Sequence, residues 1–210
     1  MPSLDTAFLV FDYAAVAVFG ASGALAAARR GHDFVTFAFF AAITGVGGGT
    51  LRDLLIDAPV FWIARPGYLL VCLGAAAAVW MAGRHTWRLS ALLWLDALGM
   101  AAYAVVGAAK ALSLGVQPIS AVVMGVMTAT FGGVLRDVVA GEPSVLLQRE
   151  IYVTAAVLGA VVFVGLAALG LDRVAAGLIG FGAALALRSA AILWGLSLPA
   201  FIGRDRDDPA

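Results

Sequence analysis

Seven apolar runs occupy nearly the whole of this 210-residue chain. Polar residues, proline or glycine separate them, and they cover Phe8–Ala28, Phe34–Ala58, Pro66–Ala82, Leu89–Ala109, Pro118–Ala140, Ile151–Leu171 and Val174–Leu198. A helix needs roughly 20 apolar residues to cross the hydrocarbon core of a bilayer. With 63% hydrophobic residues, 12% charged residues and a mean hydropathy of +1.01, the sequence predicts an all-α membrane protein. Residues 1–198 form its single transmembrane domain of seven transmembrane helices, and residues 199–210 a cytoplasmic tail.

The loops on the two sides of the membrane differ in positive charge. One side collects Arg29, Arg30, Arg84, Arg88, Arg149, Arg204 and Arg206, whereas the side of the N-terminus collects Arg65, Lys110 and Arg173. Cytoplasmic loops carry the excess of Lys and Arg, so the N-terminus is predicted outside and the C-terminus in the cytoplasm. The net charge is zero and the basic loop residues lie at span ends, which gives no indication of a nucleic-acid partner.

The sequence shows no constellation for catalysis or for holding a cofactor. The single cysteine, Cys72, lies inside the third run, which excludes an internal disulfide or a thiolate metal site. No nucleophile has a plausible base, and there is no phosphate loop and no His/Glu metal pattern. The sequence therefore predicts no enzyme, no cofactor and no metal.

An internal repeat becomes visible when the sequence is shifted by 84 residues. The shift superposes Asp12 on Asp96, Gly48-Gly49 on Gly132-Gly133, Arg52-Asp53 on Arg136-Asp137 and Tyr68 on Tyr152. Repeat one is assigned to residues 8–83 and repeat two to residues 89–171, and the seventh helix, 174–198, has no partner. Three spans per repeat is an odd number, so the repeats are inverted, and functional sites in such proteins usually lie at the repeat interface.

Both repeats place glycines inside an apolar run, in GVGGGTLRD from Gly45 to Asp53 and in FGGVLRD from Phe131 to Asp137. Glycine weakens a helix by about 1 kcal/mol relative to alanine. The second and fifth spans are therefore predicted to kink or unwind at Gly47, Gly48, Gly49, Gly132 and Gly133, with half-helices beginning near Thr50 and Val134. Tight helix packing is the alternative interpretation of these glycines.

Charged residues follow the glycines in both repeats. Helical spacing places Thr44, Gly48 and Arg52 on one face, and Thr128, Gly132 and Arg136 on the matching face. Asp53 and Asp137 turn about 100° away, so each is expected to need a partner other than the arginine beside it. Charges inside a membrane usually face an aqueous path or one another. The segments predict either ion pairs that lock the helices or a path in which the aspartates neutralise the arginines.

Three further charged residues allow two interpretations each. Asp12 and Asp96 begin equivalent spans, where an acid complements the helix dipole or lies at the mouth or inside of a cation path. Lys110 ends the fourth span, and its equivalent in the other repeat is Ala26. It either extends to the membrane surface or acts as a movable gate.

The doubled Gly-Gly-x-Leu-Arg-Asp motif in a seven-span chain resembles the prokaryotic branch of the trimeric intracellular cation channel family. The same repeat is also catalogued as a putative glycine transporter domain. The resemblance implies a homotrimer in a bacterial or archaeal cell (inner) membrane, with one pore in each protomer for K+ and Na+. It also implies that the second and fifth spans kink at the glycines and line the pore, with Arg52, Asp53, Arg136 and Asp137 beside it.

The function favoured at this point is a passive monovalent cation channel. Thr44 and Thr128 would offer hydroxyl oxygens to the ion, the Arg-Asp groups and Lys110 would gate it, and membrane lipid would surround the trimer. The alternative is a secondary carrier for a small zwitterion such as glycine, held at half-helix ends. A structural or lipid-organising protein is a third possibility, and it predicts that every Arg-Asp charge is paired in a dry interior.

Overall fold

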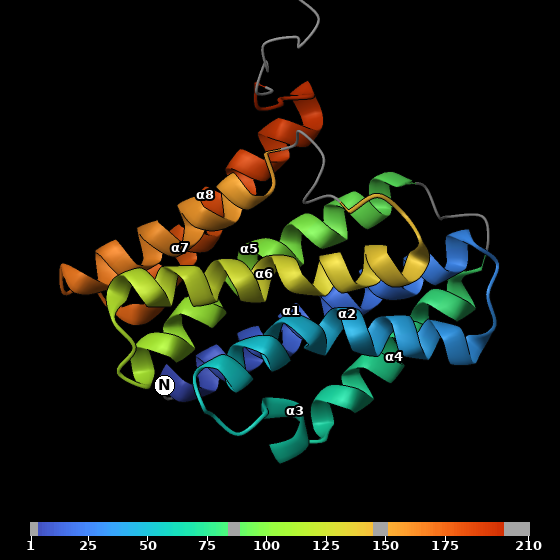
Figure 1. Cartoon of the computed structure of the whole chain (residues 1–210), viewed down its shortest axis with the longest axis horizontal. Helices are drawn as coiled ribbons and strands as arrows, with labels where there is room; N and C mark the ends of the chain where they lie inside the picture. The colour runs from blue at the N-terminus through green and yellow to red at the C-terminus, as the bar shows by residue number, and fades with distance from the viewer. Residues whose placement is uncertain (1–3, 84–88, 145–150, 200–210) are drawn as a thin grey trace, which may run out of the picture.

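The computed structural model describes residues 4–83, 89–144 and 151–199, which fold into eight helices (Figure 1). They are α1 (Leu4–Arg29), α2 (Phe34–Leu55), α3 (Phe61–Ala64), α4 (Gly67–Ala82), α5 (Leu89–Ser113), α6 (Pro118–Ala140), α7 (Val153–Ala168) and α8 (Arg173–Trp194). The tail from residue 200 and five of the arginines used for the orientation (Arg84, Arg88, Arg149, Arg204 and Arg206) lie outside the described residues.

The seven predicted spans each coincide with one helix of 16 residues or more, and α3 is an additional short helix between the second and third. Five helices, α1, α2, α5, α6 and α8, are long and apolar enough to cross a membrane. The other two, α4 and α7, are apolar but have only 16 residues each. The prediction of an all-helical membrane protein is confirmed, and the number of crossings stays a prediction.

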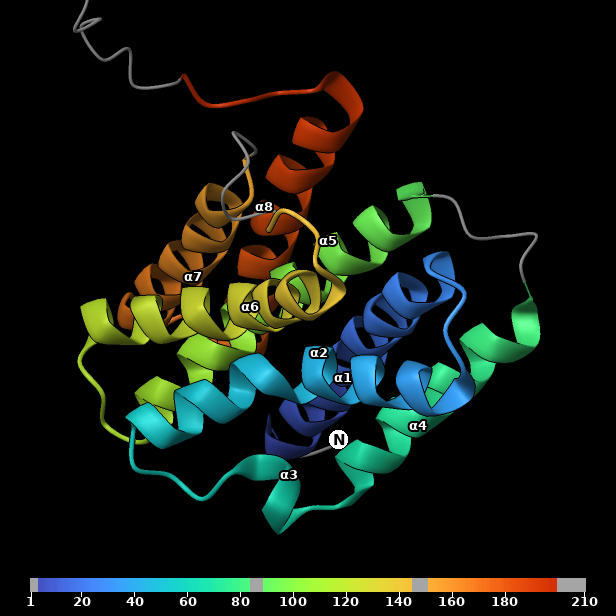
Figure 2. The same cartoon turned by 45° about the vertical axis from the view of Figure 1, so that its right-hand side comes forward.

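The helices are arranged as two similar halves. Repeat one consists of α1, α2 and α4, and repeat two of α5, α6 and α7. The first helices of the two repeats, α1 and α5, pack on each other, as do the second helices, α2 and α6. Each third helix packs on the other two helices of its own repeat, and α8 packs on α5 and α7. Figures 1 and 2 show that α1 and α5 run in opposite directions, as do α2 and α6, which is the relation expected of inverted repeats.

The glycine segments lie inside continuous helices, because α2 and α6 are unbroken from end to end. A methyl group added at Gly48 would collide with the carbonyl oxygen of Thr128, and one added at Gly132 with the carbonyl oxygen of Thr44. The glycines therefore allow the backbones of α2 and α6 to touch, which is the packing interpretation. The predicted unwinding, with half-helices near Thr50 and Val134, is wrong, since an intact helix leaves no backbone group to satisfy in the membrane. A bend in either helix stays a prediction.

The second helix begins at a side-chain cap. The carboxylate of Asp33 accepts a hydrogen bond from the backbone N–H of Thr36 at 2.8 Å, which satisfies one of the donors that a helix start leaves unpaired. This hydrogen bond lowers the pKa of the Asp33 carboxyl below its ordinary value. At the equivalent position of repeat two, Gln117 makes no side-chain cap, and α6 begins instead with Pro118.

Candidate functional site

A first group of charged residues surrounds the carboxylate of Asp53, which is fully buried. Its Oδ1 atom accepts hydrogen bonds from Arg52 Nε at 2.8 Å and from Lys110 Nζ at 2.7 Å. Its Oδ2 atom accepts the backbone N–H of Phe61 at 2.9 Å. Asp53, Arg52, Lys110 and Asp12 are called the outer cluster below, and they come from α2, α5 and α1.

Arg52 belongs to the last turn of α2, so it lies closer to the end of its helix than its position in the apolar run suggests. It is nevertheless 1% exposed, because the chain after α2 folds back through α3. The Phe61 ring lies 5.7 Å from the Arg52 guanidinium carbon and 5.8 Å from Lys110 Nζ, within reach of cation–π attraction. Among the described residues, Arg52 Nη1 is buried without a hydrogen-bond partner.

Asp12 completes the outer cluster from α1. Its Oδ2 atom accepts a hydrogen bond from the Tyr68 hydroxyl at 2.7 Å, and the Tyr68 ring stacks on Tyr13 with ring centroids 4.0 Å apart. Asp12 is two turns inside α1 and Asp96 is also well inside α5. The interpretation that these acids complement a helix dipole in the first turn is therefore wrong, because Asp12 follows the start of α1 at Leu4 by eight residues and Asp96 follows the start of α5 at Leu89 by seven.

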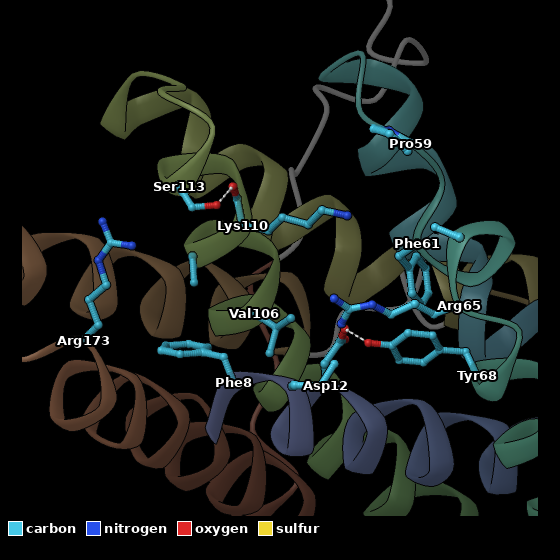
Figure 3. A pocket seen from close by; sticks show the side chains of 13 residues that line it. Phe8, Asp12, Pro59, Phe61, Arg65, Tyr68, Val106, Lys110, Ser113 and Arg173 are labelled. Carbon is cyan, nitrogen blue, oxygen red and sulfur yellow. Dashed lines mark hydrogen bonds between the residues drawn. The ribbon is translucent and has the colours of Figure 1, made fainter. Parts of the chain in front are cut away.

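A cavity of about 860 Å³ lies beside the outer cluster, at the end of the molecule where α1 begins and α5 ends (Figure 3). Figure 3 shows Asp12 and Tyr68 on one side of it and Arg173 on the other, with Lys110 reaching across toward Phe61. Its charged lining consists of Asp12, Arg65, Lys110 and Arg173. The Lys110 side chain is directed toward α2, where the buried carboxylate of Asp53 supplies its counter-charge.

A second group of charged residues, called the inner cluster, consists of Arg136, Asp96, Asp137 and Ser22, all of them buried. Arg136 Nη1 donates to Asp96 Oδ1 at 2.6 Å and to the Ser22 hydroxyl at 3.2 Å. Asp137 Oδ1 lies 2.9 Å from Arg136 Nε and 2.8 Å from Nη2. One guanidinium therefore binds two carboxylates and a hydroxyl group from α5, α6 and α1.

Both arginines contact the aspartate that follows them in sequence. The expectation that each aspartate needs a partner other than this arginine is wrong in this respect. The 100° turn separates the Cβ atoms, but the long arginine side chain bends around the helix to the neighbouring carboxylate. The expectation that the aspartates neutralise the arginines agrees with these contacts.

The predicted threonines lie between the two clusters, where α2 meets α6. Both are buried. Each hydroxyl faces a glycine of its own repeat, since Thr44 Oγ1 lies against Gly23 and Thr128 Oγ1 against Gly107. Thr128 Oγ1 also donates to the carbonyl oxygen of Met124 at 2.6 Å. In this conformation the hydroxyls belong to helix contacts, and their contact with an ion stays a prediction.

The remaining glycines of the motifs also mark close contacts. Gly47 faces the Leu135 side chain, Gly49 faces the Phe61 ring, and Gly133 faces the Tyr152 hydroxyl and Asp96. All predicted site residues therefore lie along α2 and α6 or reach them, as Lys110 does from α5. The two clusters flank the α2–α6 contact, and each arginine lies four residues beyond its glycine, roughly 6 Å along the helix axis.

Sequence reasoning did not assign a role to Tyr68, Tyr152, Ser22 or Arg188. The two tyrosines superpose in the repeat and both lie beside an aspartate, so their shared position was a usable signal. Arg188 was a stronger one, because it is an isolated charge within the seventh apolar run, and such residues rarely face lipid.

These features define a multi-pass membrane protein in which two inverted three-helix repeats bury a charge cluster toward each end of a central helix pair. No group of His, Cys, Asp or Glu among the described residues could hold a metal ion.

The sequence model of the family described as "Glycine transporter" matches residues 9–84 and 93–168, two ranges displaced by the same 84 residues as the repeat. A UPF0126 membrane protein of Vibrio cholerae is 38% identical over 205 residues, covering 95% of this chain and 85% of the relative. The UPF0126 inner membrane protein YadS of Escherichia coli K12 is 36% identical over 194 residues, covering 90% and 94%.

The structural comparison agrees with the sequence comparisons. The crystal structure of the trimeric intracellular cation channel orthologue from Rhodobacter sphaeroides superposes with a TM-score of 0.87 and 48% sequence identity. The superposition covers 91% of this chain and 100% of that one. The resemblance seen in the glycine motifs therefore extends to nearly the whole fold. The chain belongs to the prokaryotic branch of the trimeric intracellular cation channel family. This is a family of channels and not of enzymes.

Proposed function

We propose that the protein is a passive channel for monovalent cations, K+ and Na+, with one pore in each protomer of a homotrimer. The observation that carries the proposal is the near-complete structural match, at 48% identity, to a trimeric intracellular cation channel orthologue. The arrangement of charge supports it, because a cavity open to one end of the molecule leads to Asp12 and to the buried cluster around Asp53.

The path of the ion follows the central helix pair. It enters the outer cavity, passes the outer cluster, and continues between α2 and α6 to the inner cluster. The kinks at the glycines and the ion contacts of Thr44 and Thr128 belong to the open conformation, in which α2 and α6 move apart. The close contacts of Gly48 with Thr128 and of Gly132 with Thr44 hold the described conformation closed.

The arginines of the motifs act as gate elements and not as ligands of the ion. A free arginine in a narrow path would repel a cation, but Arg52 contacts Asp53, and Arg136 contacts Asp96 and Asp137. Lys110 is the most movable member of this set, because its side chain is 29% exposed and borders the cavity. Opening begins when Lys110 leaves Asp53 and exposes an acidic site to the entering ion.

We infer the orientation from the distribution of charge. The N-terminus and the outer cavity face the periplasm, and the ends of α1 and α6, where Glu142 lies 3.6 Å from Arg29 and 3.7 Å from Arg30, face the cytoplasm. A bacterial inner membrane is the proposed location, since the relative YadS carries that description.

The carrier hypothesis has less support. It required half-helix ends that bind the carboxylate of a zwitterion, and the continuous α2 and α6 leave no such ends at the glycines. Its support is the description of the family model. A carrier would saturate with its substrate and would exchange labelled glycine across a membrane.

Recording of single channels from the purified protein in planar bilayers under a KCl gradient tests the proposal. We expect unitary currents that reverse near the K+ equilibrium potential, and a changed open probability in Lys110→Gln. Arg30→Gln is the matched control, because Arg29 remains to pair with Glu142. Bilayers that stay silent while proteoliposomes exchange labelled glycine would replace the channel by the carrier.

A further inference from the structure

Arg188 is a buried charge on α8, the helix that has no equivalent in the repeat. It is 1% exposed, and its guanidinium carbon lies 5.1 Å from the centroid of the Tyr152 ring. Its Nη1 atom lies 3.5 Å from the carbonyl oxygen of Ile151. The guanidinium therefore covers the residues just before α7. A cation that lies over an aromatic face is attracted to it strongly when the site excludes water.

Tyr152 in turn borders the inner cluster. A methyl group added at Gly133 would lie 3.1 Å from the Tyr152 hydroxyl oxygen, 3.3 Å from Asp96 Oδ1 and 3.7 Å from Arg136 Nη2. These three polar atoms gather around one glycine. Arg188, the Tyr152 ring and the Arg136–Asp96 ion pair thus follow one another from α8 to α5 and α6, and the Tyr152 hydroxyl is buried without a hydrogen-bond partner among the described residues.

In repeat one a different side chain covers the equivalent tyrosine. This tyrosine, Tyr68, is covered by the ring of Tyr13, and within the part of the chain that the structure describes no cation lies over its ring. The second cation of the outer cluster is Lys110, from the first helix of the opposite repeat, and it binds Asp53 directly. The position equivalent to Lys110 is Ala26, so the inner cluster receives no cation from that direction.

We propose that Arg188 is a positioning residue of the inner cluster: by holding the Tyr152 ring, it keeps the Arg136–Asp96 pair closed. Arg188 covers the Tyr152 ring as Tyr13 covers the Tyr68 ring in repeat one. It also brings a cation near the inner cluster, whereas Ala26, at the position equivalent to Lys110, brings none. Helix α8 is then a part of the gate and not only a packing helix. The expected effect of Arg188 on ion flow rests on the proposed channel function, whereas its effect on the Arg136–Asp96 ion pair does not.

The test measures the opening of the inner cluster without relying on conduction. The Ser22 hydroxyl accepts a hydrogen bond from Arg136 Nη1, so it marks the inner cluster. Ser22→Cys in a background without the native cysteine, Cys72→Ala, places a single thiol there. The rate at which a charged methanethiosulfonate reagent modifies this thiol in the purified protein reports how often the cluster opens. We expect Arg188→Gln to raise the rate about tenfold and Arg188→Lys to leave it within about twofold of the parent.

A double-mutant cycle separates positioning through Tyr152 from a general loss of packing. Tyr152→Leu removes the ring and should raise the rate as much as Arg188→Gln does, and the double variant should be no faster than either single variant. Independent sites would instead multiply their effects. Equal rates in Arg188→Gln and the parent, or multiplied rates in the double variant, would overturn the proposal. Arg30→Gln, at the same end of the molecule, is the control and should not change the rate.

If Arg188→Gln does not fold, the comparison of Arg188→Lys with Tyr152→Leu decides, and slow modification in Tyr152→Leu would refute the proposal. In bilayers, Arg188→Gln should raise the open probability with unitary conductance and reversal potential unchanged. A changed conductance at a constant open probability would make Arg188 a pore-lining residue and overturn its role as a positioning residue. Silent wild-type bilayers would instead contradict the channel function and leave the thiol measurement decisive for Arg188.

Discussion

The two repeats place two aspartates, an arginine and a tyrosine at equivalent positions, but these residues form different hydrogen bonds and ion pairs in each repeat. In repeat two, Arg136 binds both Asp96 and Asp137. In repeat one, Arg52 binds Asp53, and the Asp12 carboxylate is taken by the Tyr68 hydroxyl. Arg52 Nη1 is left without a partner among the described residues, whereas the equivalent atom of Arg136 has two.

The difference coincides with access to solvent. The outer cluster borders the cavity through Asp12 and Lys110, and the inner cluster is buried within helix contacts. Buried ion pairs resist separation because a single buried charge is costly, so the half with more complete pairing is the more rigid one. The comparison suggests that repeat one moves first, and the following predictions test this in order of expected size.

The largest effect is expected from removing the central cation of each cluster. Arg136→Ala leaves two buried carboxylates without the guanidinium that contacts both, a change that costs about 3–5 kcal/mol. Arg52→Ala should cost distinctly less, because Lys110 and the Phe61 N–H still bind Asp53. Thermal unfolding of the purified variants, with Arg30→Gln as control, measures the difference. Equal losses would break the distinction between the two clusters.

The α2–α6 contact should be sensitive to single methyl groups and equally so in both repeats. Gly48→Ala and Gly132→Ala each place a methyl group against a backbone carbonyl of the opposite helix, and overpacking of this kind costs about 1–3 kcal/mol. Gly74→Ala and Gly165→Ala are matched controls, because a methyl group there meets nothing within 4 Å. Thermal unfolding again measures the stability of the variants. An equal loss of stability in the controls would show that the α2–α6 contact does not cause the effect.

A smaller effect is expected from the cation that only the outer cluster contains. Lys110→Gln removes a partly exposed ion pair worth about 1 kcal/mol, which should raise the open probability roughly fivefold if the closed state alone holds the pair. The reciprocal variant Ala26→Lys adds a cation near the inner cluster and should lower it. Single-channel recording decides. A lowered open probability in Lys110→Gln, or a raised one in Ala26→Lys, would show that the missing lysine does not distinguish the halves.

The smallest effect concerns the start of the second helix in each repeat. Asp33 caps α2 and Gln117 does not cap α6, so Asp33→Ala should lower the unfolding temperature slightly and Gln117→Ala should not. The pKa of Asp33 is lowered in the folded protein, so its stabilisation is present above the ordinary carboxyl pKa of about 3.9 and fades as the pH falls below it. An unfolding temperature of Asp33→Ala that equals the wild type at pH 7 would falsify the cap's contribution.

The glycine motifs show how far sequence reasoning reached. Two copies in register predicted that α2 and α6 are equivalent and central, which the fold confirms. The sequence reasoning favoured a kinked or unwound helix over a close helix contact, and the unwinding was wrong. Gly48 settles this only in three dimensions, because the carbonyl of Thr128 occupies the place of its missing side chain.

The charged residues show the opposite limit. Arg52, Asp53, Arg136 and Asp137 were predicted as a site, but the contact of each arginine with the aspartate that follows it was not expected. An arginine side chain is long enough to reach several carboxylates, and the choice depends on which helices stand nearby. Lys110 could likewise extend outward or inward, and the buried carboxylate of Asp53, on another helix, decides for inward.

The sequence by itself determined a helical membrane protein, its inverted repeat and the positions of glycine and charge, because these depend on local hydropathy and on spacing along one helix. Only the tertiary structure decided that Asp12 belongs to Tyr68 and Asp96 to Arg136, and that Arg188 lies over Tyr152. Such pairings join residues more than 30 positions apart, so they depend on how the helices pack and not on the pattern of any one of them.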